Sequence, residues 1–468
     1  MKKTIKEYKI LDLFAGIGGF SLGFKKFQIE KMKVFKIVAA LEKDKNAVNT
    51  LIKALVKDGI PYEQAVSMII QGDISLPETK KKLFDTCKDV DIIIGGPPCQ
   101  SFSMIGPRSG DKTQQEKYTN DDRDNLFEHY LEIVEHYNPQ MFVFENVKGI
   151  LSKKNNDGIK YIDIIIDRFE QLGYRLQFNN DVKEKKYTVL NAVDFGVPQN
   201  RERVIIIGNK YRINNFSPIV THCSLEKVPT TGLLPYVNLQ DAIGDLPKIV
   251  PKLTYTLPNQ KLDKKVKIDI PQQRKESIDV LNLSRNNGED RTPYHWDNFN
   301  YHYKNGTISR RIFLDFIKPS ENSELIGHKA RSQQESDVIL FENMAEGMTA
   351  NDIVSSTNEN LKKLAILIKY NMNSFKDKYK KLSWSKPSNT IIAHLQKDGN
   401  RYIHPDSQQG RTITVREAAR IQSFPDDYEI DAIGNLRFKY IGNAVPPLLG
   451  LAVADAVYRT ITSVNPKE

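Results

Sequence analysis

The chain has 468 residues, of which 40% are hydrophobic and 27% are charged, as is typical of a folded globular protein with two or three domains. Its net charge of +10 suits a polyanionic partner such as nucleic acid. Three cysteines are too few for a disulfide framework, and no cysteine–histidine spacing indicates a zinc site. Since no apolar run has the length of a membrane span and no signal peptide is present, we expect a cytoplasmic protein with no metal and no membrane partner.

The first 209 residues alternate between strand and helix patterns. The expected strands and helices are, in chain order, 7–14, 20–27 (helix), 34–42, 43–59 (helix), 65–73, 89–96, 125–137 (helix), 140–146, 159–173 (helix) and 203–209. Near-continuous apolar strands separated by helices are typical of a parallel sheet covered on both faces. We therefore predict an α/β domain with a doubly wound, mostly parallel sheet over 1–209, which binds ligands at the carboxyl ends of its strands.

The pattern changes at about residue 210. From 210 to 385, prolines, short strand-like runs and polar loops dominate, which predicts a second, smaller and irregular α+β domain. Regular signals return with a helix at 414–424, where Thr414 and Glu417 have the spacing of a capping box. A last helix is expected at 444–461, with prolines in its first turn.

The glycine-rich stretch "LDLFAGIGGFSLGF" (11–24) follows the first strand. Gly16 and Gly18 are followed by Ser21, so the third glycine of a dinucleotide fingerprint is absent. Glu42 ends the second strand and could bind ribose hydroxyls, and Asp73 ends the third strand and could bind an adenine amino group. These features together predict a nucleoside site without a pyrophosphate, as S-adenosylmethionine requires.

The stretch "GGPPCQSFS" (95–103) places Cys99 at the end of the fourth strand, behind two prolines that fix the backbone. A thiol becomes a strong nucleophile when positive charge lowers its pKa. Glu145 ends the fifth strand, and a carboxyl group in an apolar environment can act as an acid near neutrality. Because we expect the fourth and fifth strands to be neighbours, Glu145 can face Cys99. Arg201 and Arg203 alternate on the strand that follows, so both could bind a carboxylate or phosphate.

A thiol, a proton donor and a methylsulfonium donor suit methylation at carbon 5 of cytosine. Addition of the thiolate to C6, with proton donation to N3, gives an enamine whose C5 can attack the methyl group. Loss of the C5 proton and of the thiol then restores the aromatic ring. Because C5 is inaccessible in a duplex, the base must be flipped out.

At this point the sequence resembles the C5-cytosine DNA methyltransferase family over residues 1–209 and 385–468. The motifs that carry the resemblance are, in order, "DLFAGIGGF", "LEKD", "GDI", "GGPPCQSFS", "DDRDNLF", "FENV", "QNRERVIIIG", "RTITVREAARIQSFPDDY" and "YIGNAVPPLLG". The resemblance implies that Cys99 is the nucleophile and that Glu145, Arg201 and Arg203 contact the flipped cytosine. It also implies a set of residues around S-adenosylmethionine: Phe14, Gly16, Gly18, Glu42, Asp73, Ile74, Pro98, Leu126 and Asn443.

The same resemblance implies a Rossmann-like methyltransferase domain that residues 386–468 return to complete, and a target-recognition domain over 210–385. It implies S-adenosylmethionine as methyl donor, S-adenosylhomocysteine as product, and no metal. The expected partner is double-stranded DNA, with a cognate restriction endonuclease if the chain belongs to a restriction–modification system. We expect a monomer in the bacterial cytoplasm or nucleoid.

Two alternatives stay open at this point. A tRNA cytosine-5 methyltransferase would share the catalytic motifs, but the middle region is long and the "CFT" tripeptide of that branch is absent. A catalytically silent DNA-binding member need not keep "PPCQ" and "ENV". Four smaller questions are also open. Arg416 and Arg420 could be structural braces or phosphate contacts, and the aromatic stretch 292–303 could be a core or a wedge into DNA. Asn443 could contact the cofactor or only brace the structure, and no role can be derived for 328–348.

Overall fold

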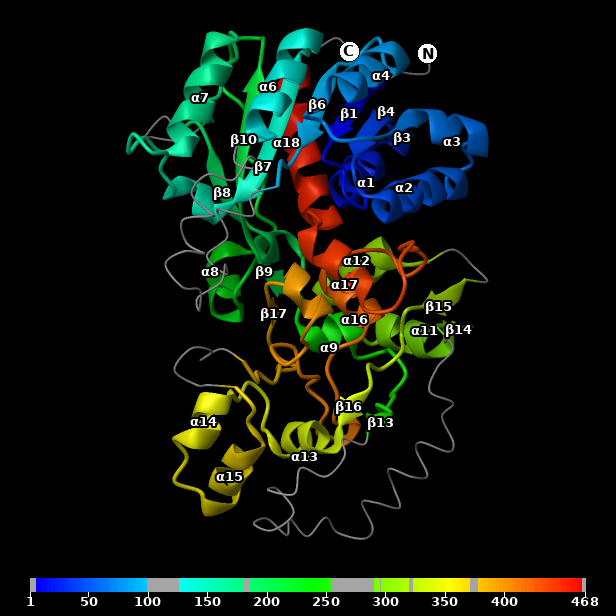
Figure 1. Cartoon of the computed structure of the whole chain (residues 1–468), viewed down its shortest axis with the longest axis vertical. Coiled ribbons are helices and arrows are strands. Elements are labelled where there is room, and N and C mark those ends of the chain that lie inside the picture. Colours follow the sequence, from blue (N-terminus) through cyan, green and yellow to red (C-terminus); the bar gives the residue numbers. More distant parts are fainter. Residues whose placement is uncertain are drawn as a thin grey trace. The chain divides into compact units, whose positions relative to one another are not determined.

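The computed structural model describes residues 6–98, 126–179, 185–254, 290–294, 296–319, 323–370 and 378–464, which are drawn as ribbons in Figure 1. The chain divides into two compact units. Unit 1 comprises Met1–Tyr236, Tyr428–Ala432 and Asn443–Glu468, and unit 2 comprises Val237–Asp427 and Ile433–Gly442. The functional division at residues 209 and 385 stays a prediction.

Unit 1 is built on a seven-stranded sheet with the order β5-β4-β1-β6-β7-β10-β8. Strands β1, β4, β5, β6 and β7 are mutually parallel, and β10 is antiparallel to both β7 and β8. These strands are β1 (Tyr8–Leu13), β4 (Phe35–Glu42), β5 (Ile69–Gln71), β6 (Ile92–Gly95), β7 (Met141–Val147), β8 (Thr188–Asn191) and β10 (Glu202–Asn209). The prediction of a mostly parallel sheet is therefore confirmed, as is the pairing of the fourth and fifth predicted strands, β6 and β7.

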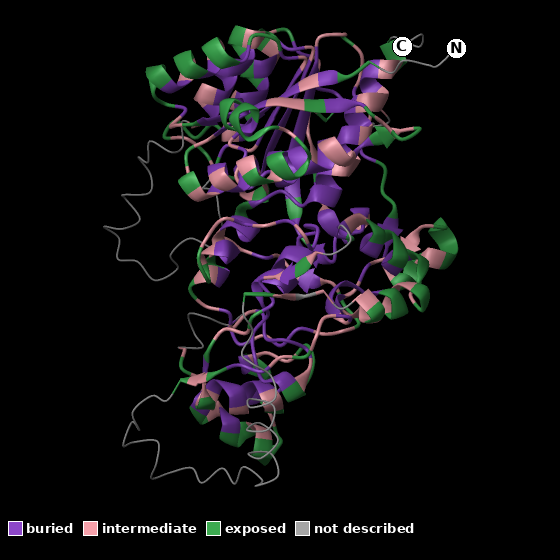
Figure 2. Cartoon of the chain, turned by 90° about the vertical axis from the view of Figure 1, so that its right-hand side faces the viewer, coloured by how far each residue is buried: buried purple, intermediate pink, exposed green. Residues whose placement is uncertain are grey.

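Helices accompany this sheet. They are α1 (Gly19–Lys26), α2 (Lys45–Lys57), α3 (Tyr62–Met68), α4 (Pro77–Thr86), α6 (Leu126–Tyr137), α7 (Tyr161–Gln171), α8 (Val228–Thr231) and α18 (Pro447–Val464). Short strands are β2 (Gln28–Ile29), β3 (Met32–Lys33), β9 (Gln199–Asn200), β11 (His222–Cys223) and β12 (Leu234–Pro235). Figure 2 shows that the strands of the sheet are mostly buried.

One predicted element was wrong in part. The run 65–73 was expected to be a strand, but its first four residues end α3 and only Ile69–Gln71 form β5. Ala65 and Met68 are both buried, and their spacing of three residues places them on one face of a helix. The apolar run therefore contains a helical period followed by a short strand.

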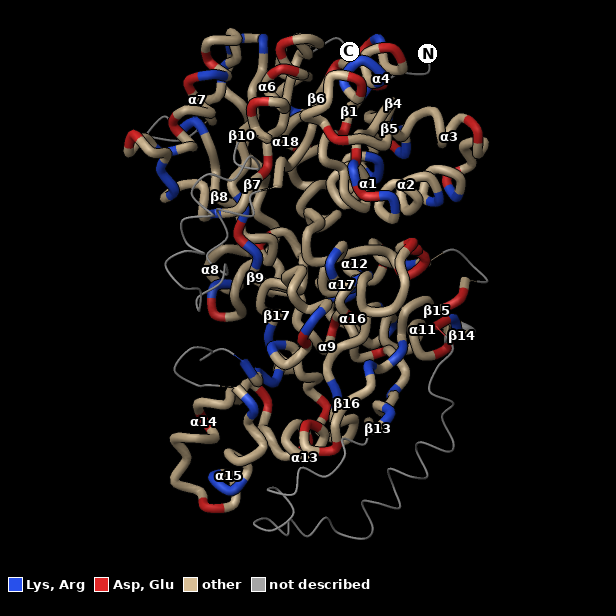
Figure 3. Tube along the Cα trace, in the orientation of Figure 1, with Lys and Arg blue, Asp and Glu red and all other residues tan. Residues whose placement is uncertain are grey.

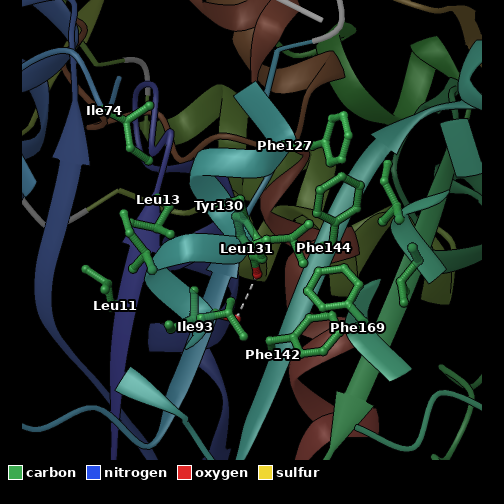
Figure 4. Packing of buried hydrophobic residues seen from close by; sticks show 14 of the residues in the cluster. Leu11, Leu13, Ile74, Ile93, Phe127, Tyr130, Leu131, Phe142, Phe144 and Phe169 are labelled. Carbon is green, nitrogen blue, oxygen red and sulfur yellow. Dashed lines mark hydrogen bonds between the residues drawn. The ribbon is translucent and has the colours of Figure 1, made fainter. Parts of the chain in front are cut away.

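A hydrophobic core cluster of unit 1 packs α6 and α7 against the sheet (Figure 4). Leu11 and Leu13 of β1 belong to it, so the alternate residue Asp12 points to the other face of the sheet. Phe142 stacks on Phe169 with ring centroids 3.9 Å apart. Tyr130 is fully buried, and its hydroxyl donates to the carbonyl of Val143 at 3.0 Å, which satisfies the polar end of the ring.

The C-terminal helix α18 packs against α1 near the start of the chain. A Cβ atom on Gly23 would lie 2.5 Å from the backbone carbon of Gly450, so the two helices meet at backbone distance. Among the described residues, the helical stretch Leu436–Val464 contains an 18-residue window with the mean hydropathy, 1.3, of a membrane span, but 67% of that window is buried inside the protein. The packing of α18 against α1 accounts for its apolar character.

Unit 2 has short elements joined by long connections. Its helices are α9 (Leu239–Ile243), α11 (Trp296–Lys304), α12 (Ile308–Ile317), α13 (Glu335–Asn343), α14 (Ala350–Val354), α15 (Glu359–Lys363), α16 (Val415–Ile421) and, up to Gly442, α17 (Leu436–Asn443). Its strands are β13 (Leu253–Thr254), β14 (Arg291–Pro293), β15 (Glu324–Ile326), β16 (Gln333–Gln334) and β17 (Ser388–Asn389). The predicted capping box of α16 is confirmed, since the Thr414 and Glu417 side chains each accept the other residue's backbone N–H.

Arg416 and Arg420 of α16 are structural braces. They are 2% and 0% exposed. Arg416 donates to the carbonyls of Ile326 and Pro425, each at 2.8 Å, and Arg420 pairs with two buried aspartates. Neither guanidinium is accessible to a phosphate in unit 2 as described, so the structure supports the bracing role.

The aromatic stretch 292–303 forms a small core. Tyr294, Trp296 and Phe299 have ring centroids 4.8 to 5.9 Å apart, and Phe299 is 2% exposed. Phe299 is therefore a core residue, as predicted for this stretch, whereas Tyr294 and Trp296 are half-buried against it and Tyr301 is 63% exposed.

Residues 328–334 form hydrogen bonds with the segment 412–414, which directly precedes α16. His328 is buried, with Nδ1 3.1 Å from the Thr414 hydroxyl and Nε2 2.8 Å from the Pro247 carbonyl. Burial lowers the pKa of His328 to about 4, so the ring is neutral near pH 7. Gln333 donates to the Thr412 hydroxyl at 3.2 Å. The role of 328–348 could not be derived from the sequence. In the structure, the start of this stretch anchors the "RTITVREAAR" segment.

Candidate active site

The candidate site lies where the strand order of the sheet reverses. From β1 the chain proceeds through β4 and β5 to one edge, and β6 and β7 lie on the other side of β1. Ligands of doubly wound sheets bind at such a point, outside the carboxyl ends of the strands. Phe14 and Asp73 follow β1 and β5, Glu42 is the last residue of β4, and Glu145 lies in β7, two residues before its end.

The glycine loop after β1 curls tightly because three residues have left-handed backbone. Phe14, Gly16 and Gly18 have φ values of 55°, 54° and 75°. The left-handed backbone at Gly18 favours glycine, and a Cβ atom there would also lie 2.7 Å from the end of the Leu51 side chain, which would have to move. Phe14 tolerates this conformation at a cost, which is typical of residues held for function.

Glu42 is held by backbone N–H groups. Its Oε2 accepts from Gly16, and its Oε1 accepts from Lys43 and Asp44, each at 2.8 Å. Burial is the largest influence on this carboxyl group and raises its pKa, while the three hydrogen bonds act in the opposite direction. The carboxylate is thus fixed against the glycine loop, where it can accept further hydrogen bonds from hydroxyl groups.

Asp73 is paired with a lysine on the neighbouring strand end. Lys43 Nζ lies 2.6 Å from Asp73 Oδ2, and Ser75 donates its N–H and its hydroxyl to Oδ1 at 3.0 and 2.8 Å. The hydrogen bond from Lys43 is the largest cause that lowers the pKa of Asp73 to about 2, so Asp73 is a carboxylate, an acceptor only, at neutral pH.

The other residues of the predicted cofactor set differ in exposure. Ile74 is 3% exposed, Leu126 packs against the core of unit 1, and Pro98 and Asn443 are exposed. Their contact with S-adenosylmethionine stays a prediction, as does the choice between cofactor contact and bracing for Asn443.

Cys99, the predicted nucleophile, lies outside the described residues, but the backbone up to Pro98 is described. Asn146, next to Glu145, donates its side-chain amide to the carbonyl of Pro97 at 3.3 Å. A Cβ atom on Gly96 would lie 2.5 Å from Glu145 Oε2, so only glycine lets the carboxylate sit against this turn. The stretch that leads to Cys99 is therefore fixed beside Glu145.

Glu145 and Arg203 form a buried ion pair. Arg203 Nε lies 2.7 Å from Glu145 Oε1, and the two residues are 8% and 9% exposed. Their strands β7 and β10 pair directly, with Arg203 opposite Val147 and Ile205 opposite Glu145. Burial lowers the pKa of Arg203, and Glu145 acts in the opposite direction. The sequence placed both residues in one site, and the structure brings them into contact.

Arg201 is directed to a different partner from that of Arg203. Its side chain is 1% exposed, and Nη2 donates to the Ala444 carbonyl at 3.0 Å. Contact between Arg201 and a target base stays a prediction. Among the described residues, no group of three or more His, Cys, Asp or Glu is arranged to hold a metal ion, and Cys87 and Cys223 are buried free thiols.

Comparison with known proteins decides the family. A family model for C-5 cytosine-specific DNA methylases matches residues 8–459. The chain belongs to this family. The type II methyltransferase M.Bpa9945I of Bacillus paralicheniformis is 30% identical over 96% of this chain and 98% of its own. M.AgeI of Thalassovita gelatinovora, also a type II methyltransferase, is 28% identical over 96% of this chain and 99% of its own.

The fold agrees with this membership. The crystal structure of a prophage-encoded DNA modification protein (E. coli) superposes with a TM-score of 0.57 at 22% identity, over 97% of this chain and all of that chain. The chain is accordingly a DNA (cytosine-5-)-methyltransferase with a Rossmann-like fold. Members of this family use S-adenosylmethionine as methyl donor and act on DNA.

One buried charge in this methyltransferase was missed at the sequence level. Asp12, in the "DLFAG" motif, is 1% exposed, and none of the described residues hydrogen-bonds its Oδ2. Burial is the largest cause that raises its pKa to about 7. The signal that singled out Glu145, a carboxylate in an apolar strand, was also present at Asp12.

We expect Asp12→Asn to stabilise the ligand-free enzyme at alkaline pH. The folded state holds the Asp12 proton up to about pH 7, whereas the unfolded chain releases it near pH 4. Stability therefore falls as pH rises through this interval, by about 1.4 kcal/mol per unit at most. In thermal melts from pH 4 to 8, the melting temperature of the variant relative to that of the wild type should rise up to about pH 7 and then stay constant. A difference in melting temperature that does not change with pH would contradict the raised pKa of Asp12.

Proposed function

We propose that this enzyme transfers a methyl group from S-adenosylmethionine to carbon 5 of one cytosine in a specific double-stranded DNA sequence. The target base is flipped out of the duplex, and Cys99 forms a transient bond to C6 of the ring. The observation that carries this proposal is the buried Glu145–Arg203 pair, 2.7 Å between Nε and Oε1, beside the fixed turn at Gly96.

The Glu145–Arg203 pair suits the cytosine edge. Arg203 has donors beyond the one bound to Glu145 and can donate to the O2 carbonyl of the base. Glu145 can hold a proton at N3 as the ring becomes an enamine, which removes the charge that would otherwise develop there. Because the pair is buried and its backbone is fixed on two paired strands, little rearrangement is needed when the base arrives.

The strand ends on the other side suit the adenosyl group. Glu42 is fixed by three N–H groups and can accept from ribose hydroxyls, and Asp73 is ionised and can accept from an adenine amino group. We assign S-adenosylmethionine to the loop of Phe14, Gly16 and Gly18, together with Ile74, Pro98, Leu126 and Asn443. Bound there, it supplies an electrophilic methyl group.

We assign target recognition to residues 210–385, and the catalytic domain to 1–209 completed by 386–468. The net charge of +10 suits phosphate contacts, so DNA binding should weaken steeply with salt. We propose that the enzyme acts as a monomer in the bacterial cytoplasm, without a metal ion, and protects DNA from a cognate restriction endonuclease.

The test is methyl transfer from isotopically labelled S-adenosylmethionine to duplex DNA and, separately, to tRNA, followed by mass spectrometry of the nucleosides. We expect labelled 5-methylcytosine in DNA only, and, with DNA that contains 5-fluorocytosine, a covalent adduct on the peptide of Cys99. Label in tRNA alone would favour the tRNA methyltransferase, and label in neither would favour the silent DNA-binding protein. An adduct on another residue would remove Cys99 from its role.

A further inference from the structure

Arg201 is one of the largest fully buried side chains of the described residues, at 1% exposure. It stands between β9 and β10, two positions before Arg203. Its backbone is held at both polar groups: its N–H donates to Asn191 Oδ1 at 2.9 Å, and its carbonyl accepts from the Ala192 N–H at 2.9 Å. The side chain therefore leaves the backbone from a fixed point.

The guanidinium of Arg201 reaches a segment 243 residues away in the chain. Its Nη2 donates to the Ala444 carbonyl at 3.0 Å. Ala444 follows Asn443 directly and stands three residues before α18. Helix α18 is itself locked onto α1 by the backbone contact between Gly23 and Gly450. The short segment 443–446 is thus held by Arg201 on one side and by the docked helix on the other.

From this geometry we infer that Arg201 is a positioning residue for S-adenosylmethionine, which holds segment 443–446 in its binding conformation, and does not contact the target cytosine. The inference rests on the proposed function, in which Asn443 lines the methyl-donor site. A charge-assisted hydrogen bond to a carbonyl in a buried site is among the stronger ones. Loss of this hydrogen bond frees the backbone beside Asn443, so it should lower the affinity for S-adenosylmethionine.

Arg203, two residues further on in β10, provides the matched comparison. It is buried to nearly the same degree, 9% exposed against 1%, but its partner is the carboxylate of Glu145 at 2.7 Å. Loss of Arg203 should therefore affect the cytosine side of the reaction and leave methyl-donor binding unchanged. Because the two arginines have different partners, the experiment has to separate an effect on S-adenosylmethionine binding from an effect on the cytosine.

The experiment measures S-adenosylmethionine binding to the DNA-free full chain by calorimetry, together with the KM for S-adenosylmethionine and kcat on duplex DNA. We expect Arg201→Ala to raise the dissociation constant roughly 10- to 100-fold, the effect of losing one charged hydrogen bond. Arg201→Lys keeps a charged donor and should recover part of this loss. For both variants, kcat at saturating methyl donor should stay within about threefold of wild type, whereas Arg203→Lys should bind S-adenosylmethionine normally and lose kcat.

All measurements are made well below the melting temperature of each variant, so that a loss of stability alone does not change the dissociation constant. Should Arg201→Ala not fold, Arg201→Lys alone decides, by the same comparison with Arg203→Lys. The inference would be overturned if the Arg201 variants bound S-adenosylmethionine normally but showed a fall in kcat or in covalent trapping on 5-fluorocytosine DNA. That result would indicate that Arg201 contacts the target cytosine. Failure of the wild type to bind S-adenosylmethionine would instead count against the proposed function.

Discussion

Replacement of Glu145 by glutamine is expected to lower kcat for DNA methylation by about 10²- to 10⁴-fold, the range for loss of a general acid. Glutamine has nearly the same shape, so it should still fit against the turn at Gly96, where the carboxylate lies now. The amide can neither take up a proton nor pass one to N3, and it leaves Arg203 without the anion that balances its buried charge. Single-turnover methyl transfer at saturating S-adenosylmethionine measures this effect directly.

Two reference variants define the interpretation of that result. Cys99→Ser should show no turnover, since the nucleophile is lost, and should still bind S-adenosylmethionine. Glu202→Gln changes a neighbouring exposed carboxylate on β10 that pairs with Lys148, and should leave kcat unchanged because exposed pairs contribute little. If Glu145→Gln turned over within tenfold of Glu202→Gln, Glu145 would not be the proton donor.

The strands of unit 1 could be predicted from sequence because they are buried on both faces. Such strands are nearly continuous apolar runs, so β1, β4, β6, β7 and β10 stand out, and their ends locate the polar residues of the site. Figure 3 shows charged residues gathered on outer helices such as α2 and α7, whereas β6 carries none. A carboxylate inside a buried strand is therefore a strong signal, and Glu145 was found this way.

Which partner each charged residue takes could not be predicted. Arg201 and Arg203 alternate on one strand, so spacing alone gave them the same role. The structure gives them different partners, the Ala444 carbonyl and the Glu145 carboxylate. The first of these contacts joins residues 243 positions apart, and no local pattern encodes it.

Unit 2 was the least predictable part for the same reason. Its helices are short, and its stability depends on contacts between distant segments, such as the anchoring of His328 to Thr414 and Pro247. Arg416 and Arg420 have the spacing of one helical face, which suits either a brace or a phosphate contact. Only their burial and their partners decide the question.

Replacement of Arg420 by methionine is expected to destabilise unit 2 by roughly 3–5 kcal/mol, the cost of breaking a buried ion pair by removing one partner. Arg420 is fully buried and lies 2.5 Å from Asp245 Oδ1 and 2.6 Å from Asp426 Oδ2. The interaction with both aspartates raises the pKa of Arg420 against the effect of burial. Without the guanidinium, two buried carboxylates face each other with Tyr294 as a remaining donor to Asp426.

Urea unfolding of the full chain measures the loss, followed by tryptophan fluorescence, because Trp296 and Trp384 both lie in unit 2. Arg291→Met is the matched control: Arg291 also pairs with a carboxylate, Glu324, but both side chains are about half exposed, so the cost should stay below about 1 kcal/mol. Asp245→Asn added to Arg420→Met should recover part of the loss, since it removes one stranded charge. Equal unfolding midpoints for Arg420→Met and Arg291→Met would mean that the Arg420 network does not hold unit 2 together, and the bracing role of α16 would have to be abandoned.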